Sequence, residues 1–260
     1  MFMCIRAGEN KMRLWLRKEM NSTIREAHRL GIDLARTPSK DSTLFESLVF
    51  GGLIIKWIKL GYRPTSRTLD MSITNTIPYR RITQASHIGE RVSRADLVKW
   101  ATPIMGLERQ HEYLSVFRQG SPLLMGRERP DILVYNVRFE VEASEDLLMG
   151  QLVTVKWNGD REEGYRLYSV ICNSEGPICR RSNGERPSPV LGIEISLDKK
   201  CDRLLEQVQV LKAAGSKAIH VFLAHQNPCP AGTMPKQVRV HNVSTSDSFR
   251  RAIAIAAGGV

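Results

Sequence analysis

Apolar residues in the first part of the chain recur at helical spacing. From Leu44 to Leu60 they return every three or four positions and cover a broad face, which predicts a largely buried helix within residues 41–64. Thr43 and Glu46 have the spacing of a capping box, so Thr43 is predicted as the N-cap, and Gly61 is predicted to end the helix. Residues 1–40 carry sparser apolar positions among many Arg and Lys, and we predict a separate helical segment there.

The pattern changes to that of strands in residues 128–224. Residues 132–135 are a short apolar run, and residues 137–142 alternate between apolar and polar, as in a strand with one buried face. Further strands are predicted over 152–157, 165–172 and 190–195, with a hairpin signal at Asn158-Gly159 and a loop over 173–189. An amphipathic helix over 203–214 and an apolar strand over 217–224 predict a right-handed βαβ crossover.

Two segments have weaker patterns. Residues 65–127 are rich in Thr, Ser, Arg and Pro, and we predict short helices over 94–100 and 107–117 within an inserted or recognition segment. Residues 225–260 are predicted to form a C-terminal extension that ends in a helix over 249–257. The chain is therefore expected to be an α/β protein with a mixed β-sheet core flanked by helices and an inserted helical, basic segment.

The net charge gives information about the binding partner rather than about the fold. The 260 residues include 38 Lys and Arg against 27 Asp and Glu, which gives a formal charge of +11. A surplus of this size favours approach to a polyanion, so nucleic acid is the expected partner, DNA first and RNA as an open alternative. No run of about twenty apolar residues occurs, so no membrane span is expected.

The five cysteines are odd in number and widely spaced, which argues against a disulfide scaffold. We therefore expect reduced thiols and a cytoplasmic location.

Three carboxylates near the first predicted strands are candidates for catalysis. Asp131 precedes the apolar run, and Glu140 and Glu142 share one face of the next strand because strand side chains repeat every two residues. If the chain folds back between the two strands, all three carboxylates converge and need a cation to neutralise them. Mg²⁺ prefers such oxygen ligands and supports phosphodiester hydrolysis. The competing interpretation is that both glutamates are solvated charges paired across the sheet, for example with Arg138.

Two other residues compete for the same chemistry. Lys156 lies in a predicted strand from which it could reach a metal site and position the attacking water. Glu194 directly precedes the predicted helix-strand unit, with Lys199 and Lys200 shortly after it. Both placements remain alternatives to Glu140 and Glu142.

The segment from Pro130 to Glu142 resembles the signature of the restriction-endonuclease-like nuclease superfamily, which is Pro-Asp, an apolar run and an (Asp/Glu)-x-Lys triplet. The order of predicted elements is also similar to the family core of a helix, a mixed sheet of about four strands and a second helix before the last strand. The resemblance implies that Asp131 and Glu140 bind metal, that Glu46 is an additional ligand, and that Glu142 stands where the family usually has Lys. It also places the family triplet near Glu194.

The sequence thus predicts a Mg²⁺-dependent endonuclease that hydrolyses DNA phosphodiester bonds. For a restriction enzyme the resemblance further implies sequence specificity and a homodimer on a palindromic site, because a two-fold symmetric protein matches two-fold symmetric DNA. In this hypothesis Asp131, Glu140 and Glu142 are catalytic, and basic residues of 65–127 contact phosphates. The alternative from another class is a non-catalytic nucleic-acid-binding or regulatory protein with the same charge and no metal requirement.

Overall fold

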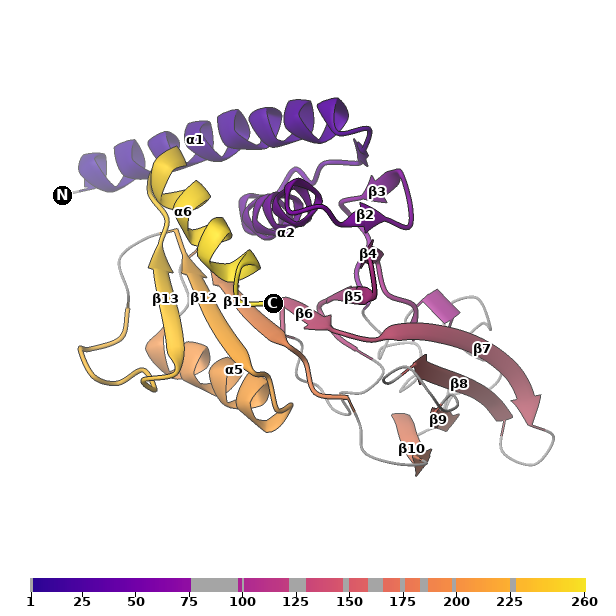
Figure 1. Cartoon of the computed structure of the whole chain (residues 1–260). Helices are drawn as coiled ribbons and strands as arrows, with labels where there is room; N and C mark the ends of the chain where they lie inside the picture. Colours follow the sequence, from indigo (N-terminus) through magenta and orange to yellow (C-terminus); the bar gives the residue numbers. More distant parts are fainter. Residues whose placement is uncertain are drawn as a thin grey trace, which may run out of the picture.

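A seven-stranded mixed sheet forms the centre of the molecule (Figure 1). The computed structural model describes residues 2–75, 98–99, 101–121, 130–146, 150–158, 166–173, 176–182, 187–197, 200–224 and 228–260, and only the backbone in 2–10 and in the strands from 142 to 182. The strand order is β13-β12-β11-β6-β5-β4-β2. The strands are β2 (Arg63–Pro64), β4 (Met105–Arg109), β5 (Glu112–Arg118), β6 (Ile132–Tyr135), β11 (Leu191–Ser196), β12 (Ala218–Leu223) and β13 (Val238–Asn242). β11, β12 and β13 run parallel, and the other pairs are antiparallel.

Helices cover both faces of this sheet (Figure 1). One face packs on α2 (Asp41–Lys59) and α6 (Ser246–Ala257), over which α1 (Phe2–Arg29) lies, and the other face packs on α5 (Cys201–Ala213). Side chains alternate along each strand, so Ile132 and Val134 of β6 join the core beneath α2, whereas Leu133 and Tyr135 join the core beneath α5. The protein is therefore α/β, with a mixed sheet of seven strands flanked by helices.

Two smaller sheets complete the described part of the fold. The strands β1 (Asp33–Ala35) and β3 (Thr68–Asp70) pair in parallel. An antiparallel sheet contains β7 (Arg138–Asp146), β8 (Gly150–Asn158), β9 (Arg166–Asn173) and β10 (Gly176–Ser182). Phe139, at the start of β7, makes edge-to-face contacts with Phe117 and Tyr135, which anchor this sheet to the α5-side core.

Helix α2 confirms the predicted buried helix but not its predicted start. Lys40 is the N-cap residue and has no side-chain capping bond, so the capping box of Thr43 and Glu46 is wrong. The helix begins earlier because the Leu44 N–H already bonds to the Lys40 carbonyl. Gly61 follows the helix with φ +95° and donates to the Ile58 carbonyl, which confirms its predicted role as the stop.

The helix predicted over 107–117 is wrong. These residues form the β4-β5 hairpin in the central sheet, with Arg109 opposite Glu112. Gln110 takes a positive φ of 52° in the two-residue turn, a conformation typical of tight hairpins that usually favours Gly or Asn. Leu107, Leu114 and Val116 alternate onto the α2-side core, so burial against α2 favours the strand over the helix. The helix predicted over 94–100 lies almost wholly outside the described residues.

Further strands and helices test the remaining sequence predictions. The strands around 132–135, 138–142, 152–157, 166–172 and 191–195, the helix of 203–214 and the parallel strand of 218–223 are confirmed. The predicted loop over 173–189 is wrong in part, because β10 pairs with β9 there. In the C-terminal extension β13 was missed, and α6 begins at Ser246 with a capping box between Thr245 and Ser248.

A disulfide joins Cys201 and Cys229, whose Cα atoms lie 4.8 Å apart. The expectation of reduced thiols is therefore wrong for this pair. The two residues follow β11 and β12, and because these strands are parallel their carboxyl ends lie at the same edge of the sheet. Their separation of 28 residues conceals this proximity in the sequence.

Two histidines form a pair on the neighbouring strands β12 and β13. Nδ1 of His220 lies 2.9 Å from Nε2 of His241, with the rings stacked, and His220 is 1% exposed. Burial, together with the smaller effects of His241 and Arg239, lowers the pKa of His220 to about 4. Burial and Arg239 likewise lower the pKa of His241.

The stability of the protein is expected to fall with acidification through this pair. A histidine whose pKa is lower in the folded than in the unfolded state contributes stability that is complete above about pH 6.5 and is lost as the pH falls toward 4. Between pH 7 and 4.5, His220 alone should cost about 2 kcal/mol in the free energy of unfolding, as measured by urea denaturation. His220→Phe should flatten this dependence. An equally steep loss in the variant would contradict the assignment.

Candidate functional site

Asp131 and Glu194 meet at one edge of the central sheet. Asp131 immediately precedes β6, and Glu194 belongs to β11. The antiparallel register ends with Ile132 opposite Ile193, so its continuation by one residue places Asp131 opposite Glu194. Oδ2 of Asp131 accepts a hydrogen bond of 2.7 Å from the Ile195 N–H. Two carboxyl groups that are far apart in the sequence are thus held next to each other by strand pairing.

Both carboxyl groups are shielded from water. Glu194 is 0% exposed and Asp131 is 7% exposed. Burial of two neighbouring carboxylates is unfavourable unless hydrogen bonds or a cation compensate for it. The hydrogen bond from Ile195 to Asp131 supplies part of this compensation.

A buried arginine supplies positive charge close by. Arg118, at the end of β5, is 1% exposed and donates a 2.7 Å hydrogen bond to the Met71 carbonyl. Its guanidinium group also donates to Oγ of Ser47 at 3.4 Å and lies 4.0 Å from Oε2 of Glu46. Burial lowers the pKa of Arg118, and the negative charges of Glu46 and Asp131 counteract that decrease. Arg118 is therefore electrostatically coupled to helix α2 and to the start of β6.

Glu46 is oriented by the residue that follows Arg118. Nε2 of Gln119 donates a 2.7 Å hydrogen bond to Oε2 of Glu46, and the Gln119 N–H donates to the Asp131 carbonyl at 3.0 Å. Gln119 has a positive φ of 52°, which a non-glycine residue adopts only at some cost. One strained residue thus contacts both Glu46 and Asp131, so helix α2 is tied to the edge that carries the two carboxyl groups.

Glu140 and Glu142 are placed on a different sheet from Asp131. β6 pairs with β5 and β11, whereas β7, which carries both glutamates, pairs with β8. Glu140 is partly buried and stands opposite Lys156 in the register of β7 and β8. The side chains of Glu142 and Lys156 lie outside the described part of the structure. The strand-to-strand fold-back on which their convergence with Asp131 depended is not formed between β6 and β7.

The carboxylates at the sheet edge could bind a divalent cation, but they would supply only a few of its ligands. Among the side chains that the structure describes, no group of three or more His, Cys, Asp or Glu is arranged to hold a metal ion. Mg²⁺ is commonly bound by only one or two carboxylates, with substrate phosphate and water as the remaining ligands. Asp131 and Glu194 fit this requirement as oxygen donors, and Glu46 on α2 is linked to Asp131 through Arg118 and Gln119.

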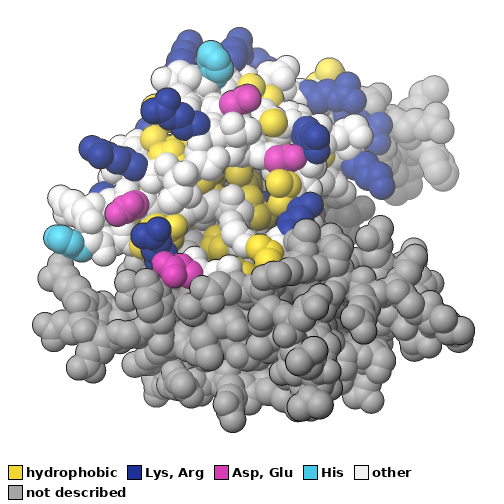
Figure 2. All heavy atoms as spheres, turned by 90° about the vertical axis from the view of Figure 1, so that its right-hand side faces the viewer, with side chains coloured by type: hydrophobic (Ala, Val, Ile, Leu, Met, Phe, Trp, Pro, Cys, Tyr) yellow, Lys and Arg dark blue, Asp and Glu magenta, His cyan; other side chains and the backbone are white. Residues whose placement is uncertain are grey.

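Positive charge is spread over the described surface. Figure 2 shows Lys and Arg side chains distributed over the described part of one face, with fewer Asp and Glu among them. No helix in the described ranges is long and apolar enough to cross a membrane.

Comparisons with known proteins do not identify the site, so its interpretation depends on the chemistry of its own residues. No protein-family model, curated protein or solved structure matches the chain.

Gln119 was missed at the sequence level, and Arg118 was considered only as one of the basic residues of 65–127 that would contact phosphates, whereas the structure buries it. The signal that would have revealed them is the alternation of Leu114, Val116 and Arg118, which becomes visible once residues 112–118 are recognised as a strand. Glu194 was considered from its position before the helix-strand unit, and the structure places it beside Asp131.

Proposed function

We propose that this protein is a divalent-metal-dependent endonuclease that acts on DNA. The observation that carries the proposal is the apposition of Asp131 and Glu194 on neighbouring antiparallel strands. Adjacent, buried carboxylates at the edge of a sheet are suited to bind Mg²⁺ next to a phosphodiester group. The net charge of +11 favours a nucleic acid as substrate.

The order of elements around the two carboxyl groups supports the restriction-endonuclease-like interpretation. Helix α2 precedes a meander of β5, β6 and β11, and α5 then connects β11 to the parallel strand β12. This is similar to the family core of a helix, a mixed sheet of about four strands and a second helix before the last strand. In this arrangement Asp131 takes the Pro-Asp position, and Glu194 takes the acidic position of the triplet in place of Glu140.

The roles of the residues follow from this placement. Asp131 and Glu194 would hold the metal ion, and Glu46 would be an additional ligand. Mg²⁺, when bound, would activate water and stabilise the leaving oxygen. Ser196 occupies the usual lysine position of the triplet, so the lysine function is assigned to Lys199 or Lys200, with Lys156 and Glu142 as alternatives. Lys200 is exposed and directly precedes α5, at the same edge of the sheet.

The first test is cleavage of supercoiled plasmid with Mg²⁺ and with EDTA. Asp131→Asn should lower the cleavage rate by about a thousandfold, since it removes a metal ligand and keeps the side-chain volume. DNA affinity, measured by fluorescence anisotropy in EDTA, should stay within a few-fold, because loss of a negative charge does not weaken contacts with phosphate. Asp247→Asn, an exposed change at the start of α6, is the matched control.

Other outcomes would redirect the proposal. Binding of DNA without cleavage in any divalent metal would favour the non-catalytic nucleic-acid-binding alternative. Cleavage of RNA but not of DNA would change the substrate class. For a sequence-specific enzyme, the plasmid should give discrete fragments, and sedimentation should show a homodimer on a palindromic site.

A further inference from the structure

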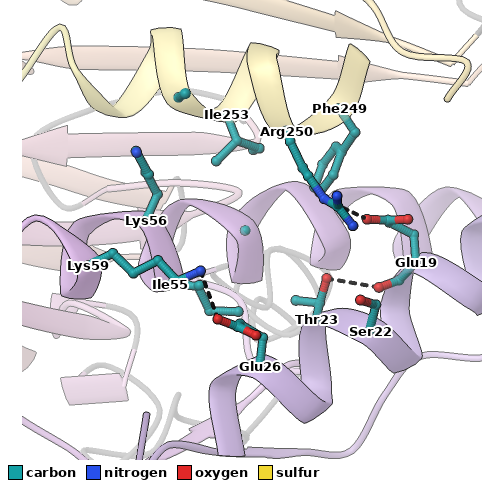
Figure 3. A pocket seen from close by; sticks show the side chains of 12 residues that line it. Glu19, Ser22, Thr23, Glu26, Ile55, Lys56, Lys59, Phe249, Arg250 and Ile253 are labelled. Atoms are coloured by element: carbon teal, nitrogen blue, oxygen red, sulfur yellow. Dashed lines mark hydrogen bonds and ion pairs between the residues drawn. The ribbon is translucent and has the colours of Figure 1, made fainter. Parts of the chain in front are cut away.

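A cavity lies between helices α1, α2 and α6 (Figure 3), and its lining includes neither Asp131 nor Glu194. Its volume is about 400 Å³, within the range of small-molecule sites. Helix α2 forms the floor with Gly52 and Ile55, while α1 and α6 form the two walls. The cavity is thus built from two consecutive helices near the N-terminus and one helix near the C-terminus.

Two glycines of α2 allow α1 and α6 to approach it closely beside the cavity. A Cβ on Gly52 would lie 2.9 Å from Phe249 of α6, and a Cβ on Gly51 would lie 3.2 Å from Thr23 of α1. Both partner helices therefore approach the α2 backbone at these two positions. One turn further along α2, the longer side chains of Ile55, Lys56 and Lys59 line the cavity instead.

Polar contacts close the two ends of the cavity. At one end, the buried Glu19 accepts a hydrogen bond from Ser246 and lies 4.0 Å from Nε of Arg250. At the other end, Glu26 forms a 2.7 Å ion pair with Lys59 of α2, and this contact lowers the pKa of Glu26. These contacts hold α1 against α6 and α2 on either side of the opening.

The lining has one more cation than anions. Lys56, Lys59 and Arg250 face Glu19 and Glu26, and the two carboxylates already interact with Arg250 and Lys59. Figure 3 shows Lys56 extending from α2 toward α6, away from the Glu26–Lys59 pair. Within the described side chains, Lys56 is therefore the cation of the cavity that is not part of an ion pair.

We propose that this cavity binds a small organic monoanion with an apolar body. The anionic group would pair with Lys56, and the apolar body would lie on Ile55, Phe249 and Ile253. The two carboxylates at the ends of the cavity disfavour ligands with several negative charges, because like charges repel. The volume limits the ligand to a compact ring system or a short chain. This site is independent of the proposed cleavage of DNA.

The test uses the full chain and the fluorescent probe 1-anilinonaphthalene-8-sulfonate, which combines one sulfonate with an apolar ring system. Saturable binding with one site per chain is expected. Lys56→Gln should weaken it about five-fold, the effect of losing one partly exposed ion pair. Ser22→Trp, which fills the cavity from α1, should weaken it more than ten-fold. Lys18→Gln, an exposed change on α1 outside the cavity, should leave the affinity unchanged.

The uncharged analogue N-phenyl-1-naphthylamine separates charge recognition from apolar adsorption. This analogue should bind the wild type more weakly than the sulfonate does. Its own affinity should be the same for the wild type and for Lys56→Gln, because it has no charge to pair with Lys56. Circular dichroism establishes that each variant is folded. Equal affinity of the wild type, Lys56→Gln and Ser22→Trp for the sulfonate would overturn the proposal, as would binding at several sites per chain.

Discussion

Glu194→Gln is expected to reduce the rate of DNA cleavage by about a thousandfold, which corresponds to about 4 kcal/mol of transition-state stabilisation. In the proposed site Glu194 is the second carboxylate beside Asp131, and an amide of the same size is a weaker ligand for Mg²⁺. The fold should tolerate the change, because replacing one of two neighbouring buried carboxylates removes like-charge repulsion. Cleavage rates at saturating Mg²⁺ and a urea unfolding curve measure the two effects separately.

Glu140→Gln is the matched comparison for Glu194→Gln. Glu140 lies in β7, which pairs with β8 and not with β6, so its loss should change cleavage by no more than a few-fold. The two variants make the same chemical change on different sheets. Loss of cleavage in Glu140→Gln with retention in Glu194→Gln would restore the arrangement first expected from the sequence and would refute the pairing of Asp131 with Glu194.

Arg118→Met is expected to lower the free energy of unfolding by about 3–5 kcal/mol. The substitution keeps much of the side-chain length but removes the hydrogen bonds to the Met71 carbonyl and to Ser47. It also removes the positive charge that is coupled to Glu46 and Asp131, which leaves partly buried carboxylates without this compensation. Urea denaturation at pH 7 measures the loss.

An exposed arginine provides the control for Arg118. Arg109 bonds to Glu112 and to the Leu60 carbonyl at the surface, so Arg109→Met should cost no more than about 1 kcal/mol. If Arg118→Met unfolds at the same urea concentration as the wild type, Arg118 does not carry the electrostatic role assigned to it.

Apolar periodicity and apolar runs predicted the most deeply buried elements. Helix α2 and the unit of β11, α5 and β12 were predicted because their apolar spacing directly reflects the surfaces that they bury. The β4-β5 hairpin was not predicted, since its turn uses Gln110 in a conformation that usually favours Gly or Asn. β10 and β13 were also missed, because Pro- and Gly-containing segments resemble loops until a neighbouring strand provides hydrogen bonds.

The candidate site was only partly predictable for a related reason. Asp131 and Glu46 were named from local motifs, but the partner of Asp131 depends on which strands pair. That pairing is non-local: β11 lies beside β6 although more than fifty residues separate them. The closest acidic spacing in sequence favoured Glu140 and Glu142, whereas strand pairing brings Glu194 next to Asp131. The roles of Arg118 and Gln119 depend on contacts with α2 that no local pattern encodes.

A crystal structure with Mn²⁺ would test most directly whether the two buried carboxyl groups share a metal ion. An anomalous difference map should contain a peak about 2.0–2.6 Å from a carboxylate oxygen of both Asp131 and Glu194, and this peak should disappear in Asp131→Asn. A protein that cleaves DNA with Mn²⁺ but holds the ion elsewhere, with Asp131 and Glu194 uninvolved, would contradict the account.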